Sequence, residues 1–219
     1  MVMRRDRIIA KILSDAGYPI EVRQVHAAYY RVEPSWLSTY GGKTMTGEEN
    51  EEAYRQLDAM TFRLLFPGRG AAEADRVSGL MRGRWPLVEK TVPLELYPDA
   101  IPTLERLKDD HYILGLISNA PSDTVKTIQS LGLPRYFPIV VVSGVVGVSK
   151  PNPEIFRIAL KEAGVAPSEA AHVGDIYEAD VLGARNAGMK GLLIDRDDLQ
   201  AERDCPRMKS LSEIHAHIR

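Results

Sequence analysis

Three polar segments of this 219-residue chain carry side chains that could act on a phosphoryl group. Ser118 and Asn119 follow the apolar run YILGLI, and Lys150 lies in SKPNP, which precedes the run EIFRIAL. Asp175 follows the apolar run AHVG, and Asp180 comes a little over one helical turn later. A hydroxyl with nearby amides can donate to phosphate oxygens, an ammonium can neutralise them, and two carboxylates can hold Mg²⁺ or the ammonium. Together these groups predict a phosphoryl-binding site with a divalent cation.

Each of these groups also has a purely structural explanation. Ser118 could cap the helix that follows it, and the two aspartates could cap the helix after Gly174. Asn152 suits an N-cap and Pro153 suits the first helical position. Capping does not explain Lys150, because the helix dipole disfavours a cation at this end, and its structural explanation is that of an ordinary surface lysine. The occurrence of all three segments in order along the chain favours a functional interpretation.

The elements that must position these residues are short strands separated by helices. Apolar runs predict strands, and amphipathic patterns between them predict helices. The strands are expected at 112–117, 138–143, 171–174 and 191–194, with helices at 100–108, 122–131, 153–163 and 179–187. Strands that are apolar throughout and alternate with helices indicate a parallel sheet covered on both faces. In such a sheet the ligand site lies beyond the carboxyl ends of the strands, where all three polar segments fall.

The first part of the chain has a different texture. Its apolar residues recur at helical spacing, as in the face formed by Ile8, Ile9, Ile12 and Leu13. Further helices are expected near residues 22–29, 54–65 and 72–81, and the glycine-rich stretch STYGGKTMTGEEN predicts a loop. We therefore predict an N-terminal helical domain over residues 1–95 and an α/β core over residues 96–219.

Composition excludes several classes of function. A formal net charge of -2, with 44% hydrophobic and 26% charged residues, is ordinary for a globular protein and gives no field that would attract nucleic acid. No apolar run is long enough to span a membrane, and no signal peptide is evident. Cys205 is the only cysteine, so no intrachain disulfide can form, and nothing beside it suggests catalysis. These features predict a cytoplasmic protein without nucleic-acid or membrane partners.

The segments LISNA, VSKPNPEIF and HVGDIYEADVLGARNAGM resemble motifs two, three and four of the haloacid dehalogenase (HAD) superfamily. The resemblance runs from about Tyr97 to Arg196, and the helical stretch before it resembles the cap of that family. It implies an α/β fold with a Rossmann-like parallel sheet and an N-terminal helical cap. It also implies that Ser118, Asn119 and Lys150 bind the phosphoryl group.

The same resemblance implies a metal site and a reaction. Asp175 would ligate Mg²⁺, and Asp180 would orient Lys150 or a metal-bound water. An acid directly after the glycine of motif four is similar to the magnesium-dependent phosphatases. Dehalogenases of the family need no metal and usually carry uncharged residues there, so Asp175 argues against dehalogenation.

Motif one of the family, a strand ending in DxD whose first aspartate is the nucleophile, has no counterpart in the sequence. The segment GLLIDRD at 191–197 imitates it, but it follows motif four, where the family has a strand away from the phosphate. The missing strand would be the first core strand, between the strands at 112–117 and 171–174. We expect a truncated N-terminus rather than an inactive relative, or a second subunit that fills the place.

The leading hypothesis is a Mg²⁺-dependent phosphatase that acts on a small phosphorylated metabolite through an aspartyl-phosphate. The alternative is a catalytically inactive phosphate-binding protein, and a haloacid dehalogenase is a third possibility. Substrate choice would come from the helical domain, where aromatic and polar residues near the loop could contact a ligand or simply pack the bundle: Tyr29, Tyr30, Trp36, Tyr40 and Lys43. An unfilled place in the sheet would also give a reason to form a homodimer.

Overall fold

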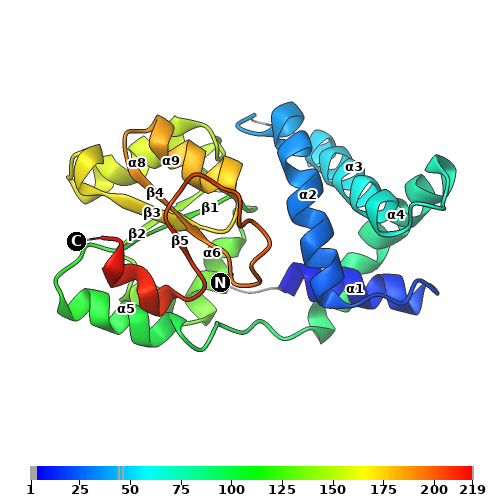
Figure 1. Cartoon of the computed structure of the whole chain (residues 1–219), viewed down its shortest axis with the longest axis horizontal. Helices are drawn as coiled ribbons and strands as arrows, with labels where there is room; N and C mark the ends of the chain where they lie inside the picture. Colours follow the sequence, from blue (N-terminus) through cyan, green and yellow to red (C-terminus); the bar gives the residue numbers. More distant parts are fainter. Residues whose placement is uncertain (1–3, 44, 46, 219) are drawn as a thin grey trace. The chain divides into compact units, whose positions relative to one another are not determined.

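The computed structural model describes residues 4–43, 45 and 47–218, which form two compact units (Figure 1). The first unit contains the described residues of 1–40 and 45–97, and the second contains those of 41–44 and 98–219. The passage from Tyr97 to Pro98 lies close to the change of texture that the sequence shows after residue 95.

The first unit is helical, as its 3.6-residue periodicity predicts. Its helices are α1 (Arg4–Asp15), α2 (Val22–Tyr40), α3 (Gly47–Leu65), α4 (Ala71–Val88) and the 3₁₀ turn η1 (Glu89–Thr91). The expected face of α1 is buried, with Ile8, Ile9, Ile12 and Leu13 at most 1% exposed. These residues pack against Phe62 of α3 and Met81 of α4.

The predicted loop of this unit is shorter in the structure, and the helices beside it are longer. Helix α2 continues through Pro34 to Tyr40, although an internal proline removes a hydrogen bond and usually ends a helix. Trp36 and Leu37 lie beyond the proline and are buried, so tertiary packing outweighs the local cost. Helix α3 begins at Gly47, seven residues before the predicted start at Tyr54, with Glu48 and Glu49 in a first turn that favours acids.

The second unit is an α/β domain with parallel strands, which confirms the predicted fold class. Its helices are α5 (Ala100–Asp109), α6 (Thr124–Ser130), α7 (Ser143–Val146), α8 (Pro153–Ala163) and α9 (Gly183–Asn186), with a π-helical segment η4 (Tyr177–Leu182) and the 3₁₀ turns η2 (Leu133–Arg135), η3 (Pro167–Glu169) and η5 (Leu211–Ala216). Its strands are β1 (Gly115–Ser118), β2 (Ile139–Val142), β3 (Ala171–Gly174), β4 (Lys190–Ile194) and β5 (Arg207–Met208).

Strand β1 begins three residues later than predicted, at Gly115 instead of Tyr112. The reason lies in how α5 ends: the Tyr112 N–H donates to Leu107 O at 3.0 Å, and His111 adopts a left-handed φ of 64°. Residues 112–114 therefore lead out of a helix-terminating turn before the chain can pair with β2.

Among the described residues the strands form two separate parallel ladders. β1 pairs with β2, and β3 pairs with β4, which in turn pairs with β5. No ladder joins β1 to β3 within the described parts of the chain. The predicted sheet is thus present in two pieces, divided where the sequence resemblance places a central strand.

The two pieces nevertheless share their hydrophobic cover. On one side, Ile117 of β1 and Ala170 beside β3 both pack against the α8 cluster, which includes Phe156. On the other side, Leu114 and Val173 both belong to the cluster around Leu107 of α5. Burial of apolar side chains, rather than backbone hydrogen bonding, therefore relates the two ladders to each other.

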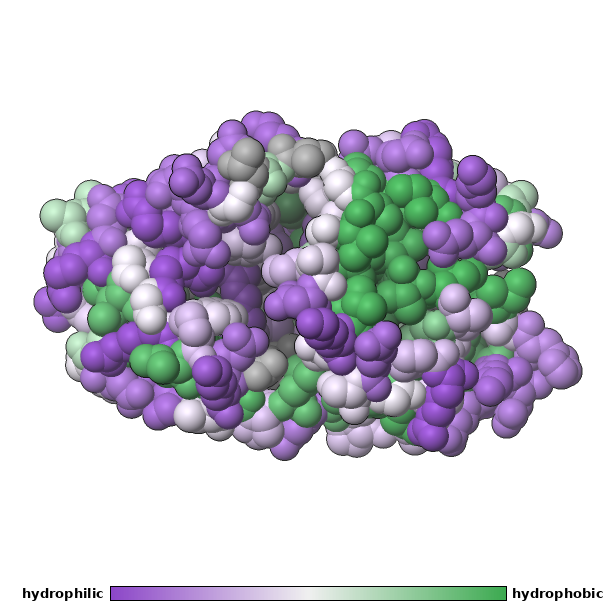
Figure 2. Space-filling view, turned by 180° about the vertical axis from the view of Figure 1, so that it is seen from behind, coloured by the Kyte–Doolittle hydropathy of each residue, from purple (hydrophilic) through white to green (hydrophobic). Residues whose placement is uncertain are grey.

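One face of the second unit carries a broad apolar area (Figure 2). The large hydrophobic residues that are most exposed in this unit include Val145 at 61% and Ile113 at 59%.

No described helix of the chain is both long enough and apolar enough to cross a bilayer.

Asp99 fastens the start of α5 to the C-terminal part of the second unit. Its carboxylate accepts hydrogen bonds from Arg196 at 2.8 and 3.0 Å, from Ser210 Oγ at 2.7 Å and from Leu211 N at 2.8 Å. Burial alone would raise the pKa of Asp99, but these donors outweigh it and lower the pKa from 3.8 to about 2.

We expect Asp99→Asn to destabilise the second unit at neutral pH by about 1–2 kcal/mol, since the carboxylate and its donors remain in contact with solvent. The folded-state pKa is depressed, so this stabilisation is complete above pH ~4 and is lost as the pH falls towards ~2. Wild type and variant should therefore differ at pH 7 and converge at low pH.

Urea unfolding measured by circular dichroism tests this prediction. Both tryptophans, Trp36 and Trp85, lie in the first unit, so a transition seen by dichroism but not by tryptophan fluorescence reports the second unit. Asp109→Asn is the control, because Asp109 is an exposed residue of the same helix. An equal difference between wild type and D99N at pH 7 and pH 2 would contradict the prediction.

Candidate active site

The five predicted site residues lie at the carboxyl ends of β1 and β3 or bind residues there. Ser118 is the last residue of β1, and Asn119 follows it. Lys150 reaches this edge from the segment before α8 and binds Asp180, which lies in η4 after β3. Asp175 directly follows β3 as an exposed residue.

The ion pair between Lys150 and Asp180 is the central contact of this site. Lys150 Nζ lies 2.6 Å from Asp180 Oδ1 and donates to Ile117 O at 3.4 Å. The side chains are only 12% and 2% exposed, respectively. The same ammonium therefore contacts the end of strand β1 and the helical segment η4 that follows β3.

Asp180 is held by two further donors. Its Oδ2 accepts the Ile176 N–H at 2.9 Å, and its Oδ1 lies 3.1 Å from His172 Nε2. Burial would raise the pKa of this carboxyl, but Lys150 and His172 outweigh it and hold the pKa well below its usual range. Asp180 is therefore ionised throughout the physiological range.

His172 supports Asp180 from within β3. Burial lowers the pKa of His172, and the nearby Lys150 ammonium lowers it further, against the opposing effect of Asp180. A neutral imidazole can donate its Nε2–H to Asp180, while its ring packs edge-on against Phe156 at 5.0 Å between centroids.

Gly174 makes room for this arrangement. A Cβ atom at Gly174 would lie 2.0 Å from the Asp180 carboxyl carbon and 2.2 Å from its Oδ2. Any side chain there would displace the carboxylate from Lys150. The glycine is thus required by the close approach of Asp180.

Asn119 binds the main chain of Lys150 with both ends of its amide. Its Nδ2 donates to Lys150 O at 2.9 Å, and its Oδ1 accepts the Lys150 N–H at 2.8 Å. The Asn119 side chain, which the sequence resemblance predicts to bind phosphate, therefore binds the main chain of Lys150. It fixes the position of the Lys150 backbone and so the point from which the lysine side chain extends.

The segment after Lys150 has the expected helix start. Asn152 caps α8 by accepting the Glu154 N–H at 3.0 Å, and Pro153 is the first helical residue. The peptide bond between Lys150 and Pro151 is cis. The predicted roles of Asn152 and Pro153 are confirmed, and Lys150 is the residue of the segment whose side chain contacts β1.

The donor set at this edge suits a hard cation. Asp175 presents a carboxylate at the exposed end of β3, whereas the oxygens of Asp180 are bound by Lys150, His172 and Ile176. Mg²⁺ commonly takes one or two protein carboxylates and completes its shell with water and phosphate oxygens. Asp175 fits a direct ligand of that kind and Asp180 a supporting one, and no cluster of three or more potential ligands occurs among the described residues.

Asp195, which imitates a motif-one aspartate in the sequence, has a structural task. It is 1% exposed and accepts the Leu199 and Gln200 N–H groups, each at 2.8 Å, and Arg207 Nη1 at 2.8 Å. Its carboxylate therefore organises the turn after β4, in agreement with the rejection of this segment as a nucleophile.

Several of the aromatic residues considered for substrate contact pack within the first unit. Trp36 is 9% exposed, donates to Ala53 O at 2.7 Å and stacks on Tyr54 with centroids 5.6 Å apart. Tyr29 donates to Glu33 at 2.7 Å, and Tyr40 donates to Gln56 at 2.7 Å. These contacts favour the packing interpretation for these residues.

The sequence reasoning missed His172 and Gln200. A polar residue inside the apolar run AHVG, two positions before Gly174 and hence on the same strand face, was the available signal for His172. Gln200 donates to Asp175 O at 2.8 Å, and nothing in its own sequence neighbourhood indicates that partner.

Comparisons with known proteins identify the family to which this chain belongs. The family model described as haloacid dehalogenase-like hydrolase matches residues 5–188. The chain is 40% identical over 124 residues to a phosphoserine phosphatase of Thermus thermophilus, a match that covers 54% of this chain and 49% of that protein. It is 42% identical over 109 residues to a glyceraldehyde 3-phosphate phosphatase of Methanopyrus kandleri, covering 49% and 46%, respectively.

The chain thus spans about half the length of these curated relatives. Among solved structures, a HAD phosphatase from Thermococcus onnurineus superposes with a TM-score of 0.54 at 25% identity, covering 96% of this chain and 86% of that one.

The ion pair predicts strong coupling between its members. Lys150→Met leaves a buried carboxylate and Asp180→Asn leaves a buried ammonium, so each should destabilise the second unit by about 3 kcal/mol. The double variant should lose clearly less than the sum of the two, because it leaves neither charge uncompensated.

A double-mutant cycle by urea unfolding at pH 7 measures this coupling. The matched control is the exposed pair Glu154 and Arg157 of α8, whose side chains are each 56% exposed and whose coupling should stay below about 0.5 kcal/mol. Additive losses at Lys150 and Asp180 would show that the pair does not hold the strand ends together.

Proposed function

Because the chain belongs to the haloacid dehalogenase-like hydrolase family, we propose that it provides the phosphoryl-binding part of a Mg²⁺-dependent phosphatase. The substrate class is a small phosphorylated metabolite. The observation that carries the proposal is the convergence of Ser118, Lys150, Asp180 and Asp175 at the ends of two parallel ladders. The curated relatives named above, both phosphatases of small metabolites, support it.

Lys150 would supply positive charge to the transferring phosphoryl group, and the Ser118 hydroxyl would donate to one of its oxygens. Asn119 would hold the Lys150 backbone, while Asp180 and His172 would keep its ammonium in place. Asp175 would hold Mg²⁺, which would contribute further positive charge to the phosphoryl oxygens when bound. A preorganised arrangement of this kind favours charge that develops in the transition state.

The proposed reaction proceeds through an aspartyl-phosphate. A carboxylate oxygen forms a bond to phosphorus while the bond to the ester oxygen breaks, and an acid protonates the departing alcohol. Water then attacks the acyl phosphate, which releases inorganic phosphate and restores the carboxylate.

We propose that the nucleophilic aspartate is carried by a strand that pairs with both β1 and β3. The facing edges of these strands have no ladder partner among the described residues, and unpaired backbone edges are costly inside a hydrophobic cover. A parallel strand placed there would end beside Lys150, at the edge where Ser118 and Asp175 also lie.

Two other functions would give different experimental results. A phosphate-binding protein without catalysis would use Lys150 and Ser118 in the same way but would lack the nucleophile. A haloacid dehalogenase would release halide without a metal, a reaction to which the exposed carboxylate of Asp175 contributes nothing evident.

Phosphate release is the test of the proposal. The chain, and a form of the protein extended at its N-terminus, would be assayed with p-nitrophenyl phosphate, phosphoserine and glyceraldehyde 3-phosphate, with Mg²⁺ or with EDTA. We expect turnover that requires Mg²⁺ and falls by about 100-fold or more in Asp175→Asn, because the direct cation ligand is lost. Asp109→Asn, on the exposed end of α5, should retain full activity.

Other outcomes contradict the phosphatase assignment in distinct ways. Binding of inorganic phosphate without turnover in either form would establish the binding-protein alternative. Halide release from 2-haloacids in EDTA, unchanged in D175N, would establish the dehalogenase.

A further inference from the structure

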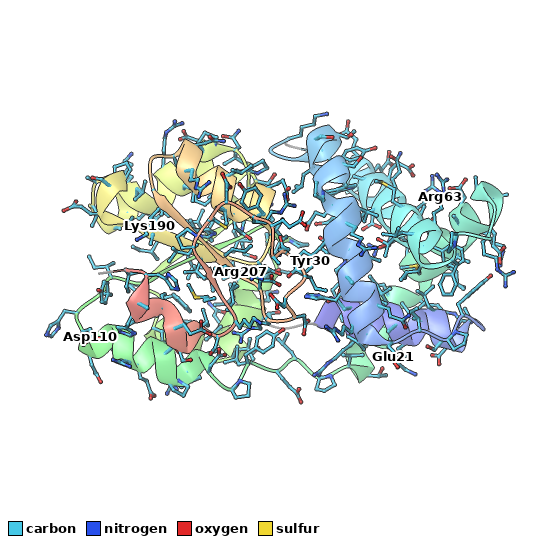
Figure 3. The ribbon with its side chains drawn as sticks, in the orientation of Figure 1. Glu21, Tyr30, Arg63, Asp110, Lys190 and Arg207 are labelled. Atoms are coloured by element: carbon cyan, nitrogen blue, oxygen red, sulfur yellow. The ribbon has the colours of Figure 1, made fainter. Side chains whose placement is uncertain are left out.

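The chain segment from Asp195 to Arg207, here called the 195–207 segment, contacts the residues that follow β3 at several points. It leaves β4, forms the orange-red loop of Figure 1 and returns as β5, near the residue labelled Arg207 in Figure 3. Asp195 and Arg207 bind each other at 2.8 Å, so the ends of the segment are tied together.

The most direct of these contacts reaches Asp175 itself. Gln200 is 7% exposed, and its Nε2 donates to the main-chain oxygen of Asp175 at 2.8 Å. The Gln200 backbone is fixed in turn, because its N–H donates to Asp195 Oδ2 at 2.8 Å. A short chain of hydrogen bonds therefore runs from the buried end of β4 to the backbone of Asp175.

Further contacts join this segment to residues that follow Asp175 in the chain. Arg203 forms an ion pair with Glu178 at 2.8 Å, and its guanidinium lies over the Tyr177 ring at 4.5 Å from the centroid. The Tyr177 hydroxyl donates to Asp204, and Arg185 donates to Asp204 O at 2.8 Å.

The same segment also contributes to the apolar packing there, since Cys205 lies against the cluster of Tyr177, Val181 and Leu193. Residues 200–205 thus contact the residues that follow β3 through a hydrogen bond to the main chain, charged side chains and an apolar side chain.

We infer that the 195–207 segment is the positioning element for the cation ligand Asp175, with Gln200 as its key residue. This inference rests on the proposed function, since it takes Asp175 as the ligand of a divalent cation. Asp175 directly follows the last residue of β3, so a shift of its backbone would move its carboxylate as well. Gln200 fixes that backbone at the carbonyl of the same residue. Residues that orient a metal ligand commonly change metal affinity by 10- to 100-fold.

Mn²⁺ binding to the intact chain tests the inference, with the free ion measured by electron paramagnetic resonance at pH 7. Gln200→Met keeps the length and burial of the side chain but removes the donor to Asp175. We expect its Kd for Mn²⁺ to rise by about tenfold or more. Arg203→Met is a second variant, at a side chain that is 31% exposed, and should weaken binding severalfold through the ion pair with Glu178.

Asp99→Asn is the control for a merely structural effect. It is expected to lower the stability of the same unit. It removes a contact to Arg196 at the start of the 195–207 segment but changes no contact of Gln200 or Asp175, so its Kd for Mn²⁺ should equal that of the wild type. A rise in Kd for Q200M with no change for D99N would therefore report positioning rather than general loosening.

Two results would overturn the inference, and they differ in what they say of the proposed function. If Q200M and R203M bind Mn²⁺ within twofold of the wild type, Gln200 does not position the ligand and the phosphatase proposal stands. If the wild-type chain and Asp175→Asn bind Mn²⁺ equally weakly, Asp175 is not a cation ligand, and the metal site of the proposed function fails together with the inference.

Discussion

The buried ion pair between Lys150 and Asp180 is the contact on which the arrangement of the second unit's strand ends depends. The two parallel ladders share apolar cover, but hydrophobic contacts are not directional and cannot fix the register of one strand end against another. Lys150 supplies that direction, because its ammonium binds Ile117 O at the end of β1 and Asp180 after β3. The pair tolerates burial only because Ile176 and His172 satisfy the remaining oxygen positions of Asp180.

The polar residues around this ion pair bind its two members and hold them in position. The Asn119 amide binds the Lys150 main chain, and the absence of a side chain at Gly174 allows Asp180 to approach closely. The residues available to a phosphoryl group are therefore fewer than the polar residues in the motifs. Ser118 and the Lys150 ammonium remain the groups that suit an anion, and Asp175 the one that suits a cation. Much of the motif sequence would therefore affect ligand binding at the proposed site only by positioning these groups.

The architecture could be predicted from the sequence better than the boundaries of the helices and strands. The residues at the strand ends could likewise be predicted better than the residues that hold them in place. Apolar runs located four strands, and the parallel-sheet rule brought Ser118, Lys150 and Asp180 to one edge, since both features depend on local pattern. The passage of α2 through Pro34 was missed, because burial of Trp36 in the bundle decides it. Gln200 was missed for a related reason: its partner Asp175 is distant in sequence, and only the folded chain joins them. Local pattern therefore predicts which residues end strands, whereas tertiary contacts decide what holds them.

In the proposed site, charge balance at the strand ends would link the binding of a cation to that of a phosphoryl group. Lys150 is neutralised by Asp180, and the depressed pKa of His172 keeps its imidazole uncharged near neutrality, so the Asp175 carboxylate leaves these four groups with an excess of negative charge. A phosphoryl dianion approaching these four groups would meet net repulsion until a divalent cation bound Asp175. A divalent cation bound there would offset this negative charge, and a bound dianion would in turn favour the cation. The two ligands of the proposed site would then strengthen each other's binding by the same factor, because coupling between two binding equilibria is reciprocal.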